Sequence, residues 1–367
     1  MSATAPPQPS RLGGRPIRVP RRRGRCLSAS ALAASALLLI AACSSTSSTS
    51  SSSAAATGSK SNLSAVLVSV QPVNDQGVMQ SFVSGFHSAA QTYHYNSVRI
   101  IVLSDPSTYV STLQTVAPRY GVVIATFPPM IQAVSTVAPN FPKTHFVLLD
   151  AQIPKPLANV QTLFFFENQS SFLSGVVAGQ MTKTDKVGFL GGVVQDVINR
   201  YLIGFYFGVK YVNPKARVCW SYVGNLESPT LGDQDALALY NKGVDILHAA
   251  TAGTETGVYQ ASEQVRKYLI GADVSILPLD PSYGLTASGP DFAGAAEVVL
   301  KQQATGTFAA GLHQYGLKDG AVRILPFSAK VPAAVQAKVA AVQSMIISGK
   351  LAVPGDNGVI PPGMVNC

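Results

Sequence analysis

The order of apolar segments along residues 63–350 is the feature that most restricts the fold of this chain. Short continuous apolar runs, typical of strands buried on both faces, alternate with amphipathic runs of helical period. The series begins at 63–70 and restarts at 186–192, after a helical run at 170–182. It therefore predicts an α/β fold of two lobes, each a parallel sheet flanked by helices. In such sheets a ligand binds outside the carboxyl ends of the strands, which here means a cleft between the lobes.

The runs also predict where each element lies. The expected strands are 63–70, 98–104, 122–127, 145–150, 160–166, 186–192, 217–224, 246–250, 268–273 and 285–288. The expected helices are 76–93, 108–118, 170–182, 196–212, 229–242, 257–267, 291–303 and 331–348. We expect an N-terminal lobe of 63–166 plus about 278–308, a C-terminal lobe of 167–277 plus about 309–350, and a tail of 351–367.

The first 42 residues have the composition of an export signal. Seven arginines and no acidic residue precede an apolar stretch at 32–42. Those 11 positions are too few for a bilayer-spanning helix, which needs about 20. A basic region, a short apolar region and small residues predict a secretory signal peptide over 1–42. The run Arg21-Arg22-Arg23 leaves both the general and the twin-arginine export routes open.

The residue after this stretch predicts a membrane anchor. Ile40-Ala41-Ala42-Cys43 resembles the bacterial lipobox, so Cys43 is the expected site of lipidation. Acyl chains there would anchor the protein by burying methylene groups in the bilayer. Residues 44–62 contain ten Ser and three Thr, a composition that forms no core and predicts a flexible tether at 43–62. We therefore expect a lipid-anchored protein on the extracytoplasmic face of the cell membrane.

The charge distribution argues against nucleic acid as a partner. The formal net charge is +9, but seven of the 27 basic residues lie in the predicted signal peptide. The other 20 nearly balance the 18 acidic residues. A nearly neutral folded part offers no basic face for DNA or RNA.

No pattern of catalytic residues is present in the sequence. It contains neither a G-x-S-x-G nucleophile turn nor a phosphate-binding G-x-x-x-x-G-K-[ST] loop, and its five histidines lack metal-ligand spacing. We expect a protein that is not an enzyme, with no cofactor and no metal. Cys219 lies in an apolar strand and Cys367 is the last residue, so two separate thiols are favoured, although a disulfide is conceivable outside the cell.

Polar and aromatic residues at the predicted strand ends are the candidate ligand contacts. Asp150 and Asp273 each end an apolar strand, where an aspartate has little structural use. Asp75 precedes the first helix and could serve as its N-cap or read ligand hydroxyls. Phe127 could stack on a planar ligand or pack in the core. Thr254 lies in a strand-to-helix turn and could cap that helix or face the ligand.

Several short motifs, taken in order, resemble the basic membrane protein family of ABC-transporter substrate-binding lipoproteins. They are Ser171-Phe-Leu-Ser-Gly175, Met181-Thr-Lys-Thr184, Lys186-Val-Gly-Phe-Leu-Gly-Gly192, Gly208-Val-Lys210, Val212-Asn-Pro214, Gly243-Val-Asp245 and Ile270-Gly-Ala-Asp273. The resemblance covers roughly 63–354 and is most specific over 171–273. It implies a type I periplasmic-binding fold with three strands crossing between the lobes, and closure of the lobes on a nucleoside-like ligand. It also implies permease and ATPase partners and a monomeric receptor.

The family's ligand pocket is only partly present. Of its first-turn motif, Asp75, Gln80 and Ser81 match, whereas Val78 and Met79 replace an aromatic residue and an asparagine. The family's G-G-T-G motif reads Ala252-Gly253-Thr254-Glu255 here, so Glu255 replaces its last glycine. Gly289-Pro290 stand where nucleoside binders carry a lysine. Tyr201 and Tyr259 could supply replacement aromatic faces or simply pack on helices.

The sequence thus predicts an importer's binding protein for a small polar solute, with Asp75, Phe127, Asp150 and Asp273 as principal contacts. The degraded first-turn motif keeps a second hypothesis open, a surface sensor or interaction lipoprotein that retains the fold without transport. A secreted hydrolase is the weakest alternative because no nucleophile–base pattern is found.

Overall fold

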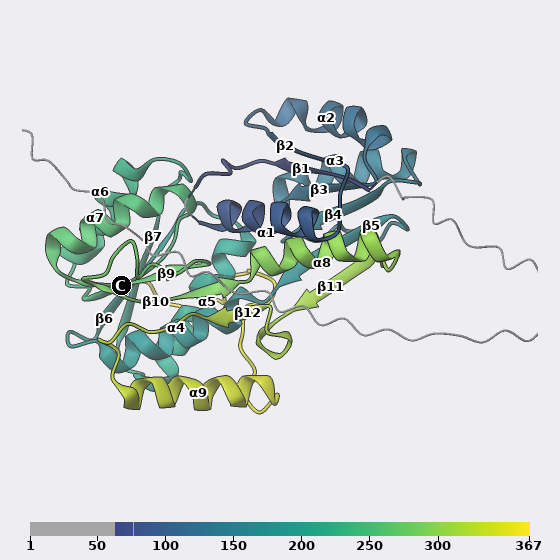
Figure 1. Cartoon of the computed structure of the whole chain (residues 1–367). Helices are drawn as coiled ribbons and strands as arrows, with labels where there is room; N and C mark the ends of the chain where they lie inside the picture. The colour runs from purple at the N-terminus through teal and green to yellow at the C-terminus, as the bar shows by residue number, and fades with distance from the viewer. Residues whose placement is uncertain (1–62, 76) are drawn as a thin grey trace, which may run out of the picture. The chain divides into compact units, whose positions relative to one another are not determined.

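The computed structural model describes residues 63–75 and 77–367, which belong to one compact unit. This unit holds two six-stranded sheets with helices on both faces of each (Figure 1). The predicted α/β fold with two lobes is therefore confirmed. The predicted signal peptide, the lipidation site at Cys43 and the tether lie outside the described residues.

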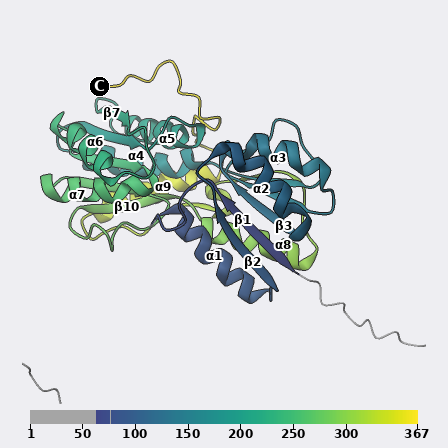
Figure 2. The same cartoon turned by 90° about the horizontal axis from the view of Figure 1, so that it is seen from above.

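The first lobe is built on a fully parallel sheet of order β11-β5-β4-β3-β1-β2. Apolar Val, Leu, Ile and Phe fill its inner strands, which are buried on both faces. The strands are β1 (Ser64–Ser69), β2 (Ser97–Val102), β3 (Val122–Thr126), β4 (His145–Leu149), β5 (Val160–Phe165) and β11 (Gly311–Tyr315). Helices α1 (Val78–Thr92) and α8 (Phe292–Thr305) cover one face, as Figure 2 shows, and α2 (Tyr109–Val116) and α3 (Ile131–Val137) cover the other.

The second lobe has a sheet of order β12-β10-β9-β8-β6-β7, parallel except for β12. Its strands are β6 (Lys186–Gly191), β7 (Arg217–Tyr222), β8 (Ile246–Ala250), β9 (Tyr268–Ala272), β10 (Gly284–Pro290) and β12 (Val322–Ile324). Helices α4 (Glu167–Met181), α5 (Asp196–Val212) and α9 (Ala333–Ile347) share one core, and α6 (Pro229–Asn241) and α7 (Glu255–Val265) pack in another. Short 3₁₀ turns connect elements at Pro106–Thr108, Ala117–Arg119, Pro128–Met130, Ala138–Asn140, Ala252–Thr254 and Leu317–Asp319.

The chain passes between the lobes three times, and the later passages differ from the predicted boundaries. The first passage, from β5 to α4, lies at the predicted position near 166. Strand β10, expected in the first lobe, instead pairs with β9 in the second lobe. Strand β11 was not predicted, and its segment, assigned to the second lobe, pairs with β5 in the first. The chain therefore returns to the first lobe for the stretch from α8 to β11. This stretch begins after β10, because β10 belongs to the buried parallel ladder of the second sheet.

The backbones of helices α4 and α5 approach each other closely in the second lobe. A Cβ atom added at Gly208 would lie 2.0 Å from the carbonyl oxygen of Phe172, and one at Gly204 would lie 2.1 Å from that of Asn168. At Gly175 the same atom would lie 2.3 Å from the carbonyl oxygen of Phe205. Real side-chain carbons do not approach so closely, so α4 and α5 pack this tightly only with glycine at the crossing.

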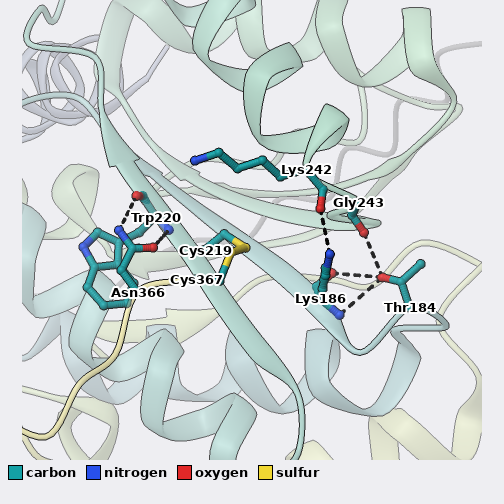
Figure 3. Close-up of a disulfide and its surroundings, with 8 residues drawn as sticks. All are labelled: Thr184, Lys186, Cys219, Trp220, Lys242, Gly243, Asn366 and Cys367. Atoms are coloured by element: carbon teal, nitrogen blue, oxygen red, sulfur yellow. Dashed lines mark hydrogen bonds between the residues drawn. A yellow bond between two sulfur atoms is a disulfide. The ribbon is translucent and has the colours of Figure 1, made fainter.

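A disulfide fixes the C-terminal tail to the edge of the second sheet (Figure 3). It joins Cys219 of β7 to Cys367, with a Cα–Cα distance of 4.7 Å. The amide group of Asn366 also hydrogen-bonds both backbone groups of Trp220. The expectation of two separate thiols is wrong, because the tail returns along β7 and brings the last residue of the chain to Cys219. The tail also protects an otherwise open sheet edge.

We predict that Gly208→Ala strongly destabilises the second lobe. The added methyl group must displace the backbone of α4 at Phe172, and overpacking of this severity costs about 3 kcal/mol or more. Urea unfolding followed by circular dichroism measures the change. Gly363→Ala is the matched control, since a Cβ there meets no atom within 4 Å and the residue is exposed. Equal unfolding midpoints for the two variants would contradict the close-packing argument.

Candidate functional site

Four residues next to the carboxyl ends of strands have left-handed backbone conformations without being glycine. Phe127 follows β3 with φ of 65°, and Asp150 follows β4 with φ of 51°. Ala252 and Asp273 follow β8 and β9 with φ of 52° and 62°. Such conformations are costly for residues with a side chain and cluster at functional sites. All four line one pocket that both lobes contribute to.

Two adjoining pockets form the cleft between the lobes. The larger pocket has a volume of about 250 Å³ and is lined by Gln71, Pro72, Asn74, Asp75, Leu226, Glu227, Pro229, Ala252, Gly253 and Thr256. The smaller pocket, of about 50 Å³, is lined by Gln71, Val78, Phe127, Asp150, Gln195, Val197, Ile198, Tyr201, Leu226, Ala250, Ala252, Asp273 and Phe292. They share Gln71, Leu226 and Ala252, so one solute can extend through both.

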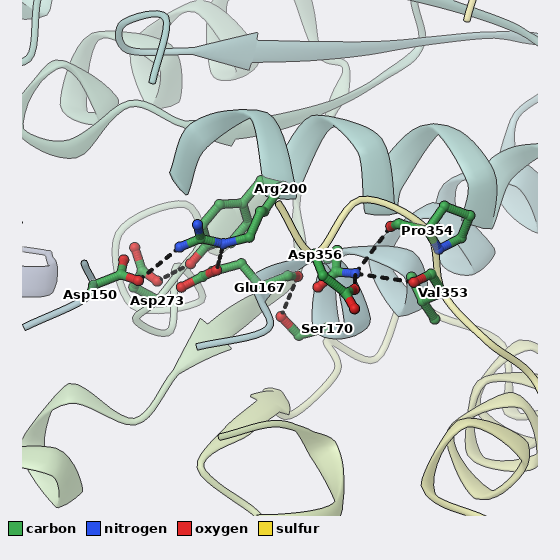
Figure 4. Close-up of polar contacts among 10 residues, drawn as sticks. Asp150, Glu167, Ser170, Arg200, Asp273, Val353, Pro354 and Asp356 are labelled. Carbon is green, nitrogen blue, oxygen red and sulfur yellow. Dashed lines mark hydrogen bonds and ion pairs between the residues drawn. The ribbon is translucent and has the colours of Figure 1, made fainter. Parts of the chain in front are cut away.

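A buried arginine connects the lobes beside the smaller pocket (Figure 4). Arg200 of α5 donates from Nη2 to Asp150 at 2.8 Å and from Nε to Glu167 at 2.5 Å. The three side chains are 3%, 1% and 0% exposed, respectively. The guanidinium also lies 4.3 Å from the ring centroid of Phe164. Asp150 belongs to the first lobe and Arg200 to the second, so this ion pair holds the lobes together at the cleft.

The two carboxyl groups of this cluster are incompletely satisfied. Asp150 Oδ2 and Glu167 Oε1 are buried and have no hydrogen-bond partner among the described residues. Burial raises the pKa of Asp150 well above its usual range, and the negative charge of Glu167 raises it further, while Arg200 acts in the opposite direction. One cation thus faces two carboxyl groups, and burial together with the charge of Glu167 opposes ionisation of Asp150.

Asp273 occupies the corresponding position in the second lobe. The hydroxyl group of Tyr201 donates to Asp273 Oδ1. Burial raises the pKa of Asp273 to about 7, although the Tyr201 hydrogen bond lowers it; Glu167 and Asp75 raise it further. Gly289 makes room for this carboxylate, because a Cβ there would lie 2.3 Å from Asp273 Oδ1. The side chain can therefore change protonation near neutral pH.

Asp75 has both a structural and a cleft position. Its carboxylate accepts hydrogen bonds from the backbone N–H groups of Gly77, Met79 and Gln80, so it caps the start of α1. The same residue lines the larger pocket. The two uses considered for Asp75 are thus compatible. Gln80 is exposed and Ser81 is partly exposed, and neither lines the two pockets of the cleft.

The loop after β8 carries Thr254, a candidate ligand contact, and the neighbouring Glu255. Thr254 is fully buried, and its hydroxyl group donates to the carbonyl oxygen of Thr251 at 2.7 Å. Glu255 is buried behind the lining and accepts a hydrogen bond from the backbone N–H of Ala272. Burial raises the pKa of Glu255 well above its usual range. Neither residue lines the two pockets of the cleft; Thr254 stands at the N-cap of α7, but its side chain makes no capping hydrogen bond to that helix.

Of the three aromatic candidates, two line the cleft and one packs in the core. Phe127 and Tyr201 both line the smaller pocket. Tyr259 instead packs in the core between α6, α7 and the second sheet. Phe292 of α8 is an aromatic residue of the pocket that the sequence analysis missed; its ring is 6.5 Å from that of Phe127 in an edge-to-face arrangement.

The sequence analysis also missed Gln71, Glu167 and Arg200. Gln71 lines both pockets, and its buried side-chain oxygen has no partner among residues 63–75 and 77–367. For the other two, the available signals are an arginine inside the largely apolar helix 196–212 and an acidic residue just after a predicted strand. Within the described part of the chain, no cluster of His, Cys, Asp and Glu could hold a metal ion, and no helix is both long and apolar enough to span a bilayer.

This fold and cleft define a solute-binding protein of the type I periplasmic-binding class. Its structure is similar to an ABC transporter solute-binding protein from Aeropyrum pernix K1, with a TM-score of 0.74 at 20% sequence identity, covering 80% of this chain and 94% of that one. The family model for PnrA-like ABC transporter substrate-binding proteins, Bmp, matches residues 62–357. The chain belongs to this family, which confirms the resemblance seen in its motifs.

Two curated relatives extend this comparison along most of the chain. The CD4+ T-cell-stimulating antigen of Listeria monocytogenes is 30% identical over 320 residues, which covers 81% of this chain and 89% of the relative. The ABC transporter nucleoside-binding protein BmpA of Lactococcus lactis is 28% identical, covering 80% and 90%. The chain is therefore an ABC transporter substrate-binding protein by family.

We predict that Arg200→Met destabilises the protein by about 3–5 kcal/mol at pH 8, because it leaves Asp150 and Glu167 buried without a cation. Removing the cation removes the one charge that lowers the pKa of Asp150. A raised carboxyl pKa makes stability fall as pH rises, so the loss should shrink at pH 5, where Asp150 takes up a proton. Chemical denaturation at both pH values measures this.

Lys215→Met is the control for this experiment, because its ion pair with Asp185 is exposed and should contribute little. The triple variant Asp150→Asn, Glu167→Gln, Arg200→Met should recover much of the lost stability, since no buried charge remains. A loss that is independent of pH would indicate a packing effect of the arginine stem instead.

Proposed function

We propose that this protein is a lipid-anchored extracytoplasmic receptor of an ABC importer, which binds one small polar solute between its lobes and closes around it. The observation that carries the proposal is the cleft itself. Residues from strand ends of both lobes line it, and four of them have left-handed backbone conformations, which are costly for residues with a side chain. Family membership supports permease and ATPase subunits as the partners.

A nucleoside-like ligand is the starting hypothesis from the family. One relative is named as a nucleoside-binding protein. In this chain, hydroxyl or amine groups of the solute would be accepted by Asp75, Asp150 and Asp273, and Phe127 would supply an apolar face. Closure would bring the carboxylates of the two lobes onto the same solute, and the permease would recognise the closed form. A monomer suffices for this role.

We expect a solute of the right class to stabilise the protein and to close the cleft. Native mass spectrometry of gently purified protein identifies any retained molecule, and a thermal-shift panel of nucleosides, sugars and amines tests candidates. At 100 times its Kd a ligand contributes about 2.7 kcal/mol. Small-angle scattering should show a smaller radius of gyration with the same solute. Asp273→Ala should weaken its binding in calorimetry; an unchanged affinity would remove Asp273 from the site.

The surface sensor is the outcome if a solute binds and closes the cleft but no permease is present. Permease and ATPase genes beside this one would support import. Absence of any stabilising solute and of any closure would contradict the receptor function as a whole.

We predict that Cys43 anchors the protein. Cys43→Ser should move the protein from the membrane fraction to the soluble fraction, because acyl chains are the expected attachment. Labelling with a radioactive fatty acid provides the measurement, and Cys26→Ser is the matched control within the predicted signal peptide. Membrane retention without label would contradict lipidation at Cys43.

A further inference from the structure

The side chains that line the cleft have an uneven charge. Asp75 and Glu227 line the larger pocket, and Asp150 and Asp273 line the smaller one. No lysine, arginine or histidine lines either pocket in the described chain. Arg200, next to the smaller pocket, already contacts two carboxylates. Where these carboxyl groups are ionised, the cleft is a site of negative potential, which favours a positively charged solute.

One carboxylate oxygen of this cleft needs a hydrogen-bond donor. Asp150 is 1% exposed; its Oδ1 accepts from Arg200, while its Oδ2 has no partner among the described residues. Buried polar atoms are nearly always paired, and leaving one open is costly. A donor carried by the solute would satisfy this oxygen. Because the acceptor is a carboxylate, a cationic N–H group is the donor that gains most from it.

Three aromatic rings line the smaller pocket, together with six aliphatic side chains. Phe127 and Phe292 meet edge to face there, and Tyr201 adds a third ring beside Asp273. Ring faces carry partial negative charge and attract ammonium and guanidinium groups. Carboxylates together with aromatic rings are the chemistry that recognises an organic cation.

We propose that the smaller pocket receives the cationic group of the solute, so that the transported ligand is a protonated amine or a related organic cation. The pocket's volume of about 50 Å³ suits a small polar head, since a water molecule takes roughly 30 Å³, and the rest of the solute extends into the larger pocket. This inference rests on the proposed receptor function and names the class of its ligand.

A proton shared by Asp150 and Glu167 would also satisfy their unpaired oxygens, and no cationic solute would then be needed. The pH dependence of solute binding distinguishes a shared proton from a bound cation. Asp273, whose pKa burial raises to about 7, is the group to follow; it faces Tyr201, Glu167 and Asp75, and its charge also acts on Asp150 and Glu255. A cation binds best when these carboxyls are ionised, so its affinity should rise from pH 5.5 to pH 8.

Matched pairs of probes test the charge requirement by calorimetry at pH 8. The pairs are 5′-amino-5′-deoxyadenosine with adenosine, and 2-phenylethylamine with 2-phenylethanol; each differs in an ammonium or hydroxyl group. We expect the amine of at least one pair to bind ten times more tightly than its neutral partner. That advantage should shrink about tenfold at pH 5.5, where the amines stay protonated but Asp273 becomes neutral.

Variants connect this preference with the named carboxylates. Asp273→Asn and Asp150→Asn should each remove most of the preference for the amine, and Glu263→Gln, an exposed residue of α7, should keep it. Asp273→Asn is the decisive variant if loss of the Arg200 ion pair unfolds Asp150→Asn. Near pH 7, amine binding should release protons, which titrations in buffers of different ionisation enthalpy detect.

Equal affinity within both pairs, tighter binding of the neutral partners, or no binding of either amine overturns the inference. A neutral molecule found in the purified protein overturns it as well. In those cases a neutral solute that stabilises the protein and closes the cleft still supports the receptor function. That function fails only if no solute of the panel binds.

Discussion

The ion pair between Arg200 and Asp150 is the interaction on which the geometry of the cleft depends. It joins a helix of the second lobe to a strand end of the first, and Glu167, at the first crossing between lobes, holds the same guanidinium. Charges this deeply buried are stable only in good mutual geometry. The cluster therefore fixes the position of the two lobes relative to each other beside the smaller pocket. Any movement of the lobes must either preserve these ion pairs or break them at a considerable cost in free energy.

If the lobes close around a solute as proposed above, the three segments that cross between them form the hinge. The chain passes between the lobes after β5, after β10 and after β11, and the first of these passages leads directly into Glu167. The tightly packed α4–α5 pair carries Glu167 and Arg200 on one rigid element of the second lobe. The hinge motion proposed for ligand binding would therefore move these two side chains as a unit relative to Asp150.

Much of the fold could be predicted from the sequence because the buried strands are continuous apolar runs. Strand 246–250 and helix 196–212 have the predicted bounds. Strand β11 was missed because Gly311–Tyr315 is only half-buried at a sheet edge, so its apolar signal is weak. Asp150, Asp273 and Phe127 could be named as candidates because strand-end position is local information, and all three line the smaller pocket. Arg200, Gln71 and the Cys219–Cys367 pairing depend on contacts between distant segments, which no local pattern records.

The properties that mark the cleft all reduce the stability of the unliganded protein. Left-handed conformations at Phe127 and Ala252 cost on the order of 1 kcal/mol or more each, since neither side chain favours them. Asp150 and Asp273 add buried carboxyl groups that burial and mutual repulsion keep from ionising easily. The backbone conformation alone would favour glycine at these four strand ends. Their presence is understandable if a bound solute supplies the missing donor and charge, so that the ligand-bound form recovers stability that the empty form lacks.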